Sequence, residues 1–135
     1  MGKLSVDLLV ERDLGVALRM ARHINEYNEQ RKDIDKQMTE EANGIVSRLE
    51  SMKHNSSIVL YDEDWKKGVI GIVASRLTEI YFRPTVVLTR EGELATGSAR
   101  SVTGFDVYSA IKSCEDLLIN FGGHTYAAGL NKCDK

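Results

Sequence analysis

Length, composition and charge already exclude several classes of protein. The chain has 135 residues, of which 42% are hydrophobic and 28% charged, and it contains a single proline. These values are typical of one small globular domain with an appendage, and they exclude two large domains or a disordered chain. The 18 basic and 20 acidic residues give a net charge of −2, so a polyanion would have to be held by a few placed cations and backbone amides.

The cysteines and the lengths of the apolar runs indicate the cellular compartment of the protein. Cys114 and Cys133 form no Cys-x-x-Cys pair, which predicts reduced thiols rather than a disulfide framework or a structural zinc site. The longest apolar run is far shorter than the roughly 20 residues of a membrane span, and Met1–Val10 lacks the pattern of a signal peptide. We therefore expect a cytoplasmic protein without a membrane partner.

The region from Asp13 to about Lys53 has the spacing of an amphipathic helix. It contains no proline and two glycines, and apolar residues recur at helical intervals. We take Asp13 as the N-cap and expect a continuous helix about 60 Å long at 1.5 Å per residue. The residues that follow cannot cover so long a helix, so we expect it to project, dimerise or pack on a partner. The alternative is a break at Asn43-Gly44 and a helical hairpin.

After Asn55 the pattern changes to short strands and helices. The expected elements are, in chain order, a strand over Ser57–Tyr61, a helix over Gly68–Tyr81, strands over Thr85–Thr89 and Leu94–Val102 joined at Glu91-Gly92, a helix capped by Asp106 that runs through Leu117, and a glycine-rich turn over Phe121–Gly129 before a last short element. This order predicts an α/β protein. A long N-terminal connector helix in residues 1–54 precedes a small domain in residues 55–135, whose mixed β-sheet is flanked by helices.

The start of the first helix in this domain combines groups that favour an anion. Trp65, Lys66 and Lys67 place an aromatic ring and two cations beside free N–H groups of the first turn. The alternative for Trp65 is a place in the core. The same helix carries a stripe of small residues, which we interpret as a face that packs closely on the sheet: Gly68, Gly71 and Ser75.

The segment Thr96–Ser101 is the most suggestive one for binding. In a strand, alternation places Ser98 and Arg100 on the same face, where a hydroxyl and a planar guanidinium suit a phosphate group. The alternative is an edge-strand arginine whose partner is Glu93 or Asp106.

A second candidate is the glycine-rich segment that contains His124. Gly122 and Gly123 permit a positive φ and a close approach of the backbone, and His124 can donate to a phosphate or relay a proton. The alternative is a loop histidine that forms only local hydrogen bonds. The other two histidines, His23 and His54, are predicted to be solvated.

Catalytic chemistry is not apparent in the sequence. No histidines and carboxylates have the spacing of metal ligands, and we interpret Asp62-Glu63-Asp64 as a solvated loop. No nucleophile has a base beside it. The sequence therefore predicts anion-binding groups without a catalytic centre.

Six motifs in series resemble the DHH-associated domain of the RecJ single-stranded-DNA exonucleases. They are Asp64–Leu77, Arg83-Pro84, Gly97–Ser101, Gly104–Asp106, Cys114–Leu118, and Phe121–His124 with Ala127–Gly129. The stretch Asn25–Ile34 also resembles the long helix that connects the two core domains in that family.

The resemblance implies the substrate-binding part of a 5′→3′ single-stranded-DNA exonuclease of DNA repair and recombination. It implies that manganese or magnesium is held by a separate DHH domain, a partner in the same full-length protein, while this chain holds no metal and is inactive alone. Ser98 and Arg100 would contact the 5′ phosphate of single-stranded DNA, and Ser101 would also bind the substrate. Gly122, Gly123 and His124 would lie beside the scissile phosphate.

The chain also departs from the family pattern. Lys66 stands where the family often has histidine, and the chain ends before the family's C-terminal strand, helices and oligonucleotide-binding fold, so we expect a truncated chain. Two other functions remain open. One is a DHH-family phosphodiesterase acting on short oligonucleotides or cyclic dinucleotides, and the other is a non-catalytic binding or assembly module.

Overall fold

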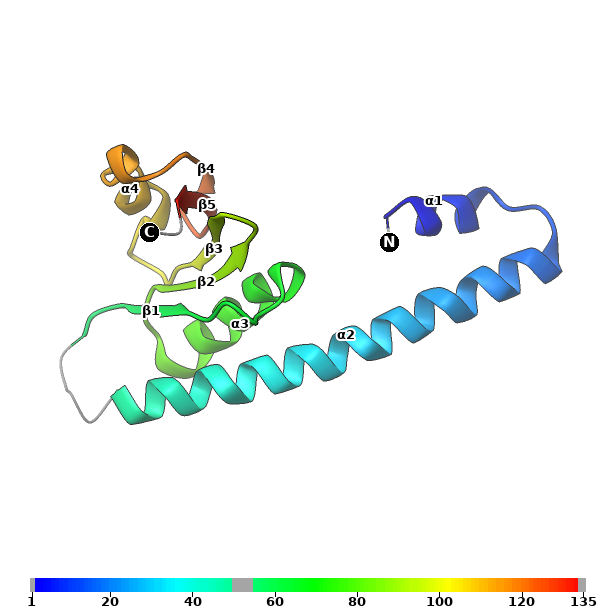
Figure 1. The fold of residues 1–135 in the computed structure, drawn as a ribbon, viewed down its shortest axis with the longest axis horizontal. Coiled ribbons are helices and arrows are strands. Elements are labelled where there is room, and N and C mark those ends of the chain that lie inside the picture. Colours follow the sequence, from blue (N-terminus) through cyan, green and yellow to red (C-terminus); the bar gives the residue numbers. More distant parts are fainter. Residues whose placement is uncertain (1, 50–54, 134–135) are drawn as a thin grey trace. The chain divides into compact units, whose positions relative to one another are not determined.

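The computed structural model describes residues 2–49 and 55–133 and divides the chain into two compact units (Figure 1). The first unit is Met1–Lys36 and the second is Gln37–Lys135. The second unit begins inside a helix, before the change in composition near Asn55, because Met38, Ala42 and Val46 of that helix are buried.

Two helices lie at the N-terminal end. Helix α1 covers Gly2–Val10 and was not predicted, whereas α2 covers Leu14–Leu49 as the periodicity predicts. The Oδ1 atom of Asp13 accepts a hydrogen bond from the Val16 N–H at 2.8 Å, so Asp13 is confirmed as the N-cap.

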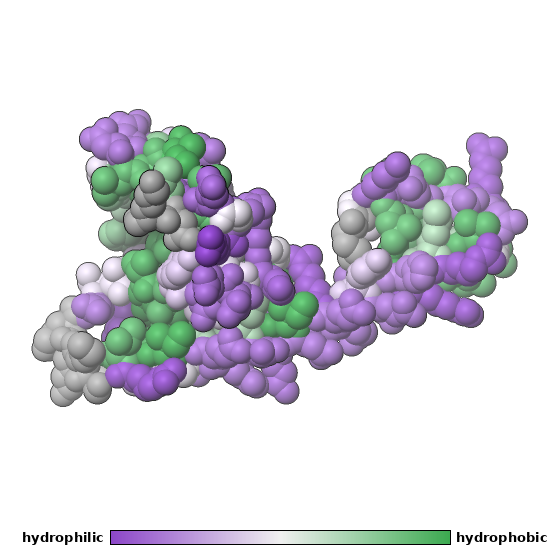
Figure 2. All heavy atoms as spheres, in the orientation of Figure 1, coloured by the Kyte–Doolittle hydropathy of each residue, from purple (hydrophilic) through white to green (hydrophobic). Residues whose placement is uncertain are grey.

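Helix α2 is continuous through Asn43-Gly44, and the alternative of a helical hairpin is wrong. The buried Ala42 and Val46 on both sides of that dipeptide hold it in the helix. The predicted end near Lys53 falls outside the described residues. Hydrophilic side chains line α2 on the side shown in Figure 2. No helix within the described ranges is long and apolar enough to cross a membrane.

The second unit contains one mixed sheet of five strands, which confirms the α/β class. Its strands are β1 (Ile58–Tyr61), β2 (Thr85–Glu91), β3 (Leu94–Arg100), β4 (Asn120–His124) and β5 (Ala127–Cys133). Their order across the sheet is β1-β2-β3-β5-β4. Only β1 and β2 pair in parallel among these strands, and the other neighbours are antiparallel.

Helices cover parts of both faces of the sheet. Helix α3 (Lys67–Tyr81) packs on β2 and β3 through Val73 and Leu77, and it lies between the sheet and the end of α2 (Figure 1). The Tyr81 hydroxyl donates to Oδ1 of Asn43, which ties α3 to α2. Helix α4 (Val107–Lys112) packs on the opposite face, beside β4 and β5. Its buried residues join a small core there: Ala99, Val107, Ile111, Ala128 and Leu130.

The predicted helix that starts after Asp106 is shorter than expected. Asp106 is its N-cap, because Oδ1 accepts from the Ser109 N–H at 3.0 Å. This hydrogen bond lowers the pKa of Asp106 below its ordinary value. The helix ends at Lys112, and a 3-10 turn over Glu115–Leu117 replaces the expected last turn.

The glycine-rich turn predicted over Phe121–Gly129 is wrong. This segment is a β-hairpin in which Thr125-Tyr126 connects β4 to β5. Glycines weaken a strand because of their backbone entropy, but here pairing with β5, in the register Gly122↔Gly129, supplies the ordering that local propensity lacks. The turn expected at Glu91-Gly92 is present, with Gly92 at a φ of 64°.

Candidate functional site

Three rows of residues cross β3, β5 and β4 on the face of the sheet that α3 only partly covers. Because side chains alternate along a strand, residues two apart share this face, and the register aligns them across the strands. The rows are Thr96–Asn131–Asn120, Ser98–Gly129–Gly122 and Arg100–Ala127–His124. We call this surface the open face, because Asn120, Gly122, His124 and Gly129 are all exposed.

Ser98 and Arg100 lie together on the open face, as strand alternation predicts. Arg100 Nη1 donates to Ser98 Oγ at 2.9 Å and to the Ala99 carbonyl at 2.8 Å. Among the described residues Arg100 forms no ion pair with Glu93 or Asp106, the partners of the alternative interpretation. The guanidinium is therefore held in place without a counter-charge, and it can bind an anion.

Helix α3 makes room for this guanidinium at Gly71. A Cβ atom at Gly71 would lie 2.8 Å from Arg100 Nη2 and 3.1 Å from Ser98 Oγ. The stripe of small residues in α3 thus has a second explanation at this position, because Gly71 faces the candidate binding pair. A Cβ at Gly68 would meet no atom within 4 Å.

Gly71→Ala should displace the Arg100 guanidinium with little change in stability. The added methyl group meets the end of a flexible side chain, and alanine gains about 0.5–1 kcal/mol over glycine within a helix. We expect the Arg100 Nε–H resonance to move while the free energy of unfolding changes by less than about 1 kcal/mol. Gly68→Ala is the matched control and should leave this resonance in place. An unmoved Arg100 signal in Gly71→Ala would show that Gly71 does not shape the pair.

His124 lies at the end of β4, exposed on the open face. Its Nδ1 accepts a hydrogen bond from the Tyr126 N–H at 3.3 Å, which is the local contact that the alternative predicts. A neutral imidazole that accepts at Nδ1 carries its proton on Nε2. No described residue is hydrogen-bonded to Nε2, so His124 can donate outward from this atom.

The two neighbouring glycines have different roles. Gly123 has a φ of 147°, and a Cβ there would lie 2.3 Å from the Ala127 carbonyl oxygen. The hairpin itself therefore requires glycine at 123. Gly122 has no positive φ, and a Cβ there would meet nothing within 4 Å. Together with Gly129 it leaves bare backbone on the open face.

Trp65 is a core residue in this structure. It is 4% exposed, its Nε1 donates to Glu41 Oε2 at 3.1 Å, and its carbonyl accepts from the Thr89 hydroxyl at 2.6 Å. Its ring therefore has almost no surface on which a base could stack, in agreement with the core alternative.

The two lysines at the start of α3 are exposed but differ in their contacts. Lys67 Nζ forms an ion pair with Glu91 Oε2 at 2.6 Å, which lowers the pKa of Glu91. Lys66 precedes the helix, and its backbone N–H contacts Met38 Sδ at 3.5 Å. The predicted anion site at this helix start thus loses one cation to Glu91 and one N–H group to Met38.

Ser101 is not part of the open face. Its hydroxyl donates to the Phe105 carbonyl at 2.7 Å, and its N–H donates to the Tyr126 carbonyl at 3.0 Å. These contacts close the loop that follows β3. His23 is exposed, as predicted, and His54 lies outside the described residues.

The acidic loop Asp62-Glu63-Asp64 contributes to an ion pair at the surface. Glu63 of the acidic loop pairs with Arg90 at 3.5 Å. In the described part of the chain no group of three His, Cys, Asp or Glu side chains could hold a metal ion. Two residues of the open face, Asn120 and Asn131, were not predicted from the sequence. Strand alternation would have placed Asn120 beside Gly122 and His124 if the segment had been interpreted as a strand.

Fold and site together define a class: an α/β domain that follows a long helix and presents a serine–arginine pair and a histidine from one face of a mixed sheet. The sequence matches the DHHA1 domain family over residues 54–134, and the chain belongs to this family.

This chain is similar to one part of several larger RecJ proteins. The single-stranded-DNA-specific exonuclease RecJ of Bacillus subtilis is 38% identical over 128 residues, which cover 93% of this chain and 16% of that protein. Crystal structures of RecJ from Thermus thermophilus are similar in fold over 98% of this chain. The complex with Mg²⁺ has a TM-score of 0.82 at 28% identity and the complex with Mn²⁺ one of 0.80 at 29%. This chain spans 20% and 19% of those two chains.

Proposed function

We propose that this chain is the substrate-binding part of a RecJ-like 5′→3′ single-stranded-DNA exonuclease of DNA repair and recombination. The observation that carries the proposal is the Ser98–Arg100 pair, whose guanidinium is fixed by Ser98 Oγ and lies against Gly71 on the open face. A terminal phosphate offers the oxygens that this pair can bind, since a guanidinium forms two parallel hydrogen bonds and a hydroxyl supplies a third.

The chemistry of bond cleavage belongs to another part of the proposed enzyme. The Thermus RecJ structures contain Mg²⁺ or Mn²⁺, whereas the described residues here offer no ligand set for either ion. In the proposal a DHH domain of the same full-length protein holds the metal. The residues of this chain bind and orient DNA: Arg100 holds the 5′ phosphate, and His124 donates from Nε2 to the scissile phosphate.

A binding experiment on the 135-residue chain tests the proposal. We expect 5′-phosphorylated single-stranded DNA to bind more tightly than the same strand with a 5′ hydroxyl, because only the former carries the group that Arg100 would hold. Affinity should be micromolar or weaker and depend little on salt, since a net charge of −2 releases few counterions. Equal binding of both strands, or a preference for a cyclic dinucleotide, would contradict a 5′-end site.

The chain alone should release no nucleotides from DNA in the presence of Mg²⁺ or Mn²⁺. Hydrolysis of this kind needs a metal-activated water, and the described residues do not form a metal site. Incubation of end-labelled single strands with the purified chain checks this expectation. Metal-dependent release that survives loss of Asp62 and Asp64 would refute the proposed division of labour.

His124→Ala should lower turnover more than affinity in an exonuclease that contains this chain. The imidazole would contribute a hydrogen bond as charge develops on the phosphate, so we expect kcat to fall by about 2- to 12-fold with KM nearly unchanged. Steady-state kinetics on 5′-phosphorylated single strands measures both constants. If kcat is unchanged, His124 has only its local contact with Tyr126.

A further inference from the structure

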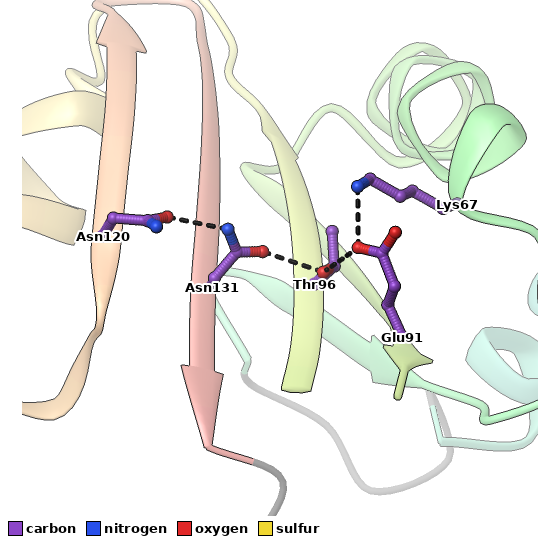
Figure 3. Close-up of polar contacts among 5 residues, drawn as sticks. All are labelled: Lys67, Glu91, Thr96, Asn120 and Asn131. Atoms are coloured by element: carbon purple, nitrogen blue, oxygen red, sulfur yellow. Dashed lines mark hydrogen bonds and ion pairs between the residues drawn. The ribbon is translucent and has the colours of Figure 1, made fainter. Parts of the chain in front are cut away.

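A chain of polar contacts crosses the open face next to the Ser98 row (Figure 3). Asn131 Nδ2 donates to Asn120 Oδ1 at 2.7 Å. The Thr96 hydroxyl lies 2.8 Å from Asn131 Oδ1 and 3.2 Å from Glu91 Oε2, and Lys67 Nζ lies 2.6 Å from that same carboxylate oxygen. We call Thr96, Asn131 and Asn120 the amide row. At one end of this row, Thr96 contacts the Lys67–Glu91 ion pair, and at the other end the Asn120 side chain is exposed.

These contacts orient the Asn120 side chain. Its Oδ1 is occupied by Asn131, so its Nδ2 is the group left to bind something else. No described residue is hydrogen-bonded to this Nδ2, and Asn120 is exposed. Both polar groups of Asn131 are engaged, one with Thr96 and one with Asn120. The amide row therefore presents one oriented N–H donor to the open face.

The amide row is the neighbour of the row that contains Ser98, two residues away along each strand. Asn120 and Gly122 are two residues apart on β4, and the general rise along a strand separates such residues by about 6.6–6.8 Å. The guanidinium of Arg100 reaches Ser98 Oγ, so a bound phosphate lies near the middle row. Between Ser98 and Asn120 the surface is formed by Gly129 and Gly122, where no side chain stands above the backbone. A flat ring attached to the phosphate through its sugar can lie on this strip.

The amide row carries no net charge, so it favours an uncharged acceptor on the ligand. Lys67 forms an ion pair with Glu91, and the lysine lowers the pKa of Glu91, which stays ionised at neutral pH. Thr96, Asn131 and Asn120 carry no charge, and the donor that they leave exposed is Nδ2 of Asn120. A second phosphate would gain little here, whereas a base edge supplies the neutral acceptor that an amide N–H needs.

We propose that Asn120, oriented by Asn131 and Thr96, donates from Nδ2 to the base of the 5′-terminal nucleotide. This inference rests on the proposed function, since it takes the terminal phosphate to be bound by Ser98 and Arg100. Every base carries an acceptor on one of its edges, so such a contact positions the terminal nucleotide without demanding one sequence. Asn120 would then be a substrate-contacting residue, and Asn131 a positioning residue.

Nuclear magnetic resonance of the 135-residue chain can test the base contact of Asn120 separately from the phosphate site at Ser98 and Arg100. The probes are a 5′-phosphorylated thymidine tetranucleotide and the same molecule with an abasic residue at its 5′ end. With the first probe we expect shifts at the Asn120 side-chain amide and at Ser98 and Arg100. With the abasic probe the Asn120 shift should disappear, while those at Ser98 and Arg100 should remain.

A variant adds an affinity readout. Asn120→Ala should weaken binding of the thymidine probe by about 2- to 12-fold and leave binding of the abasic probe unchanged. Asn28→Ala, which changes an exposed asparagine in α2, should affect neither. If both probes shift the Asn120 amide equally, or Asn120→Ala weakens both equally, the row contacts the DNA backbone and the inference is wrong while the phosphate site stands. If neither probe shifts Ser98, Arg100 or Asn120, the inference and the proposed function both fail.

Discussion

Arg100→Ala should slow the degradation of 5′-phosphorylated single-stranded DNA by about 10- to 150-fold in an exonuclease that contains this chain. The variant loses one charge-assisted contact with the phosphate, and such a contact contributes about 1.5–3 kcal/mol of binding free energy. The guanidinium is well placed for such a contact, because it is held by Ser98 Oγ and the Ala99 carbonyl and has no acidic partner among the described residues. Initial rates under subsaturating substrate measure the effect.

Two further variants and one substrate comparison define the role of Arg100. Arg100→Lys should restore part of the activity, since lysine keeps the charge and loses the planar fork. Ser98→Ala removes a neutral hydrogen bond and should cost about 1 kcal/mol. The effect of Arg100→Ala should vanish on strands with a 5′ hydroxyl. If it slows both substrates by the same factor, Arg100 binds the DNA backbone in general and does not anchor the 5′ end.

Gly123→Ala should destabilise the sheet unit, Gln37–Lys135, by about 2–4 kcal/mol. The new Cβ would lie 2.3 Å from the Ala127 carbonyl oxygen and 2.5 Å from the Ala128 Cα, and neither backbone atom can move without breaking the pairing of β4 with β5. The φ of 147°, which glycine adopts readily, adds a second cost for any residue with a side chain. Urea denaturation followed by circular dichroism measures the loss.

The neighbouring glycine supplies the control for this measurement. Gly122→Ala places its methyl group in open space, so we expect the unfolding free energy to change by less than about 1 kcal/mol. Equal stability of the Gly122 and Gly123 variants would mean that the hairpin relaxes around the methyl group. The close contacts and the φ of Gly123 would then not account for the glycine at this position.

Local signals account for the part of the fold that could be predicted. Asp13 and Asp106 are helix N-caps because their carboxylates accept backbone N–H groups three residues ahead. The alternation in Thr96–Ser101 predicted that Ser98 and Arg100 share a face, and they do. The glycines in Phe121–Gly129 led to the wrong prediction of a turn, since their preference for turns is outweighed by pairing with β5.

The family motifs and strand alternation could be recognised from the amino-acid order, because they depend on residues within a few positions of one another. The open face depends on contacts between distant parts of the chain. Thr96 and Asn131 meet only because β5 inserts between β3 and β4, and Gly71 matters only because α3 packs on β3 beside Arg100. Trp65 is likewise buried, and its Nε1 donates to Glu41 of α2, which is 24 residues away in the chain. Such pairings are stabilised by the burial and hydrogen bonding of the whole unit. The free energy of these non-local contacts does not depend on any one segment of the sequence, so local patterns cannot predict them.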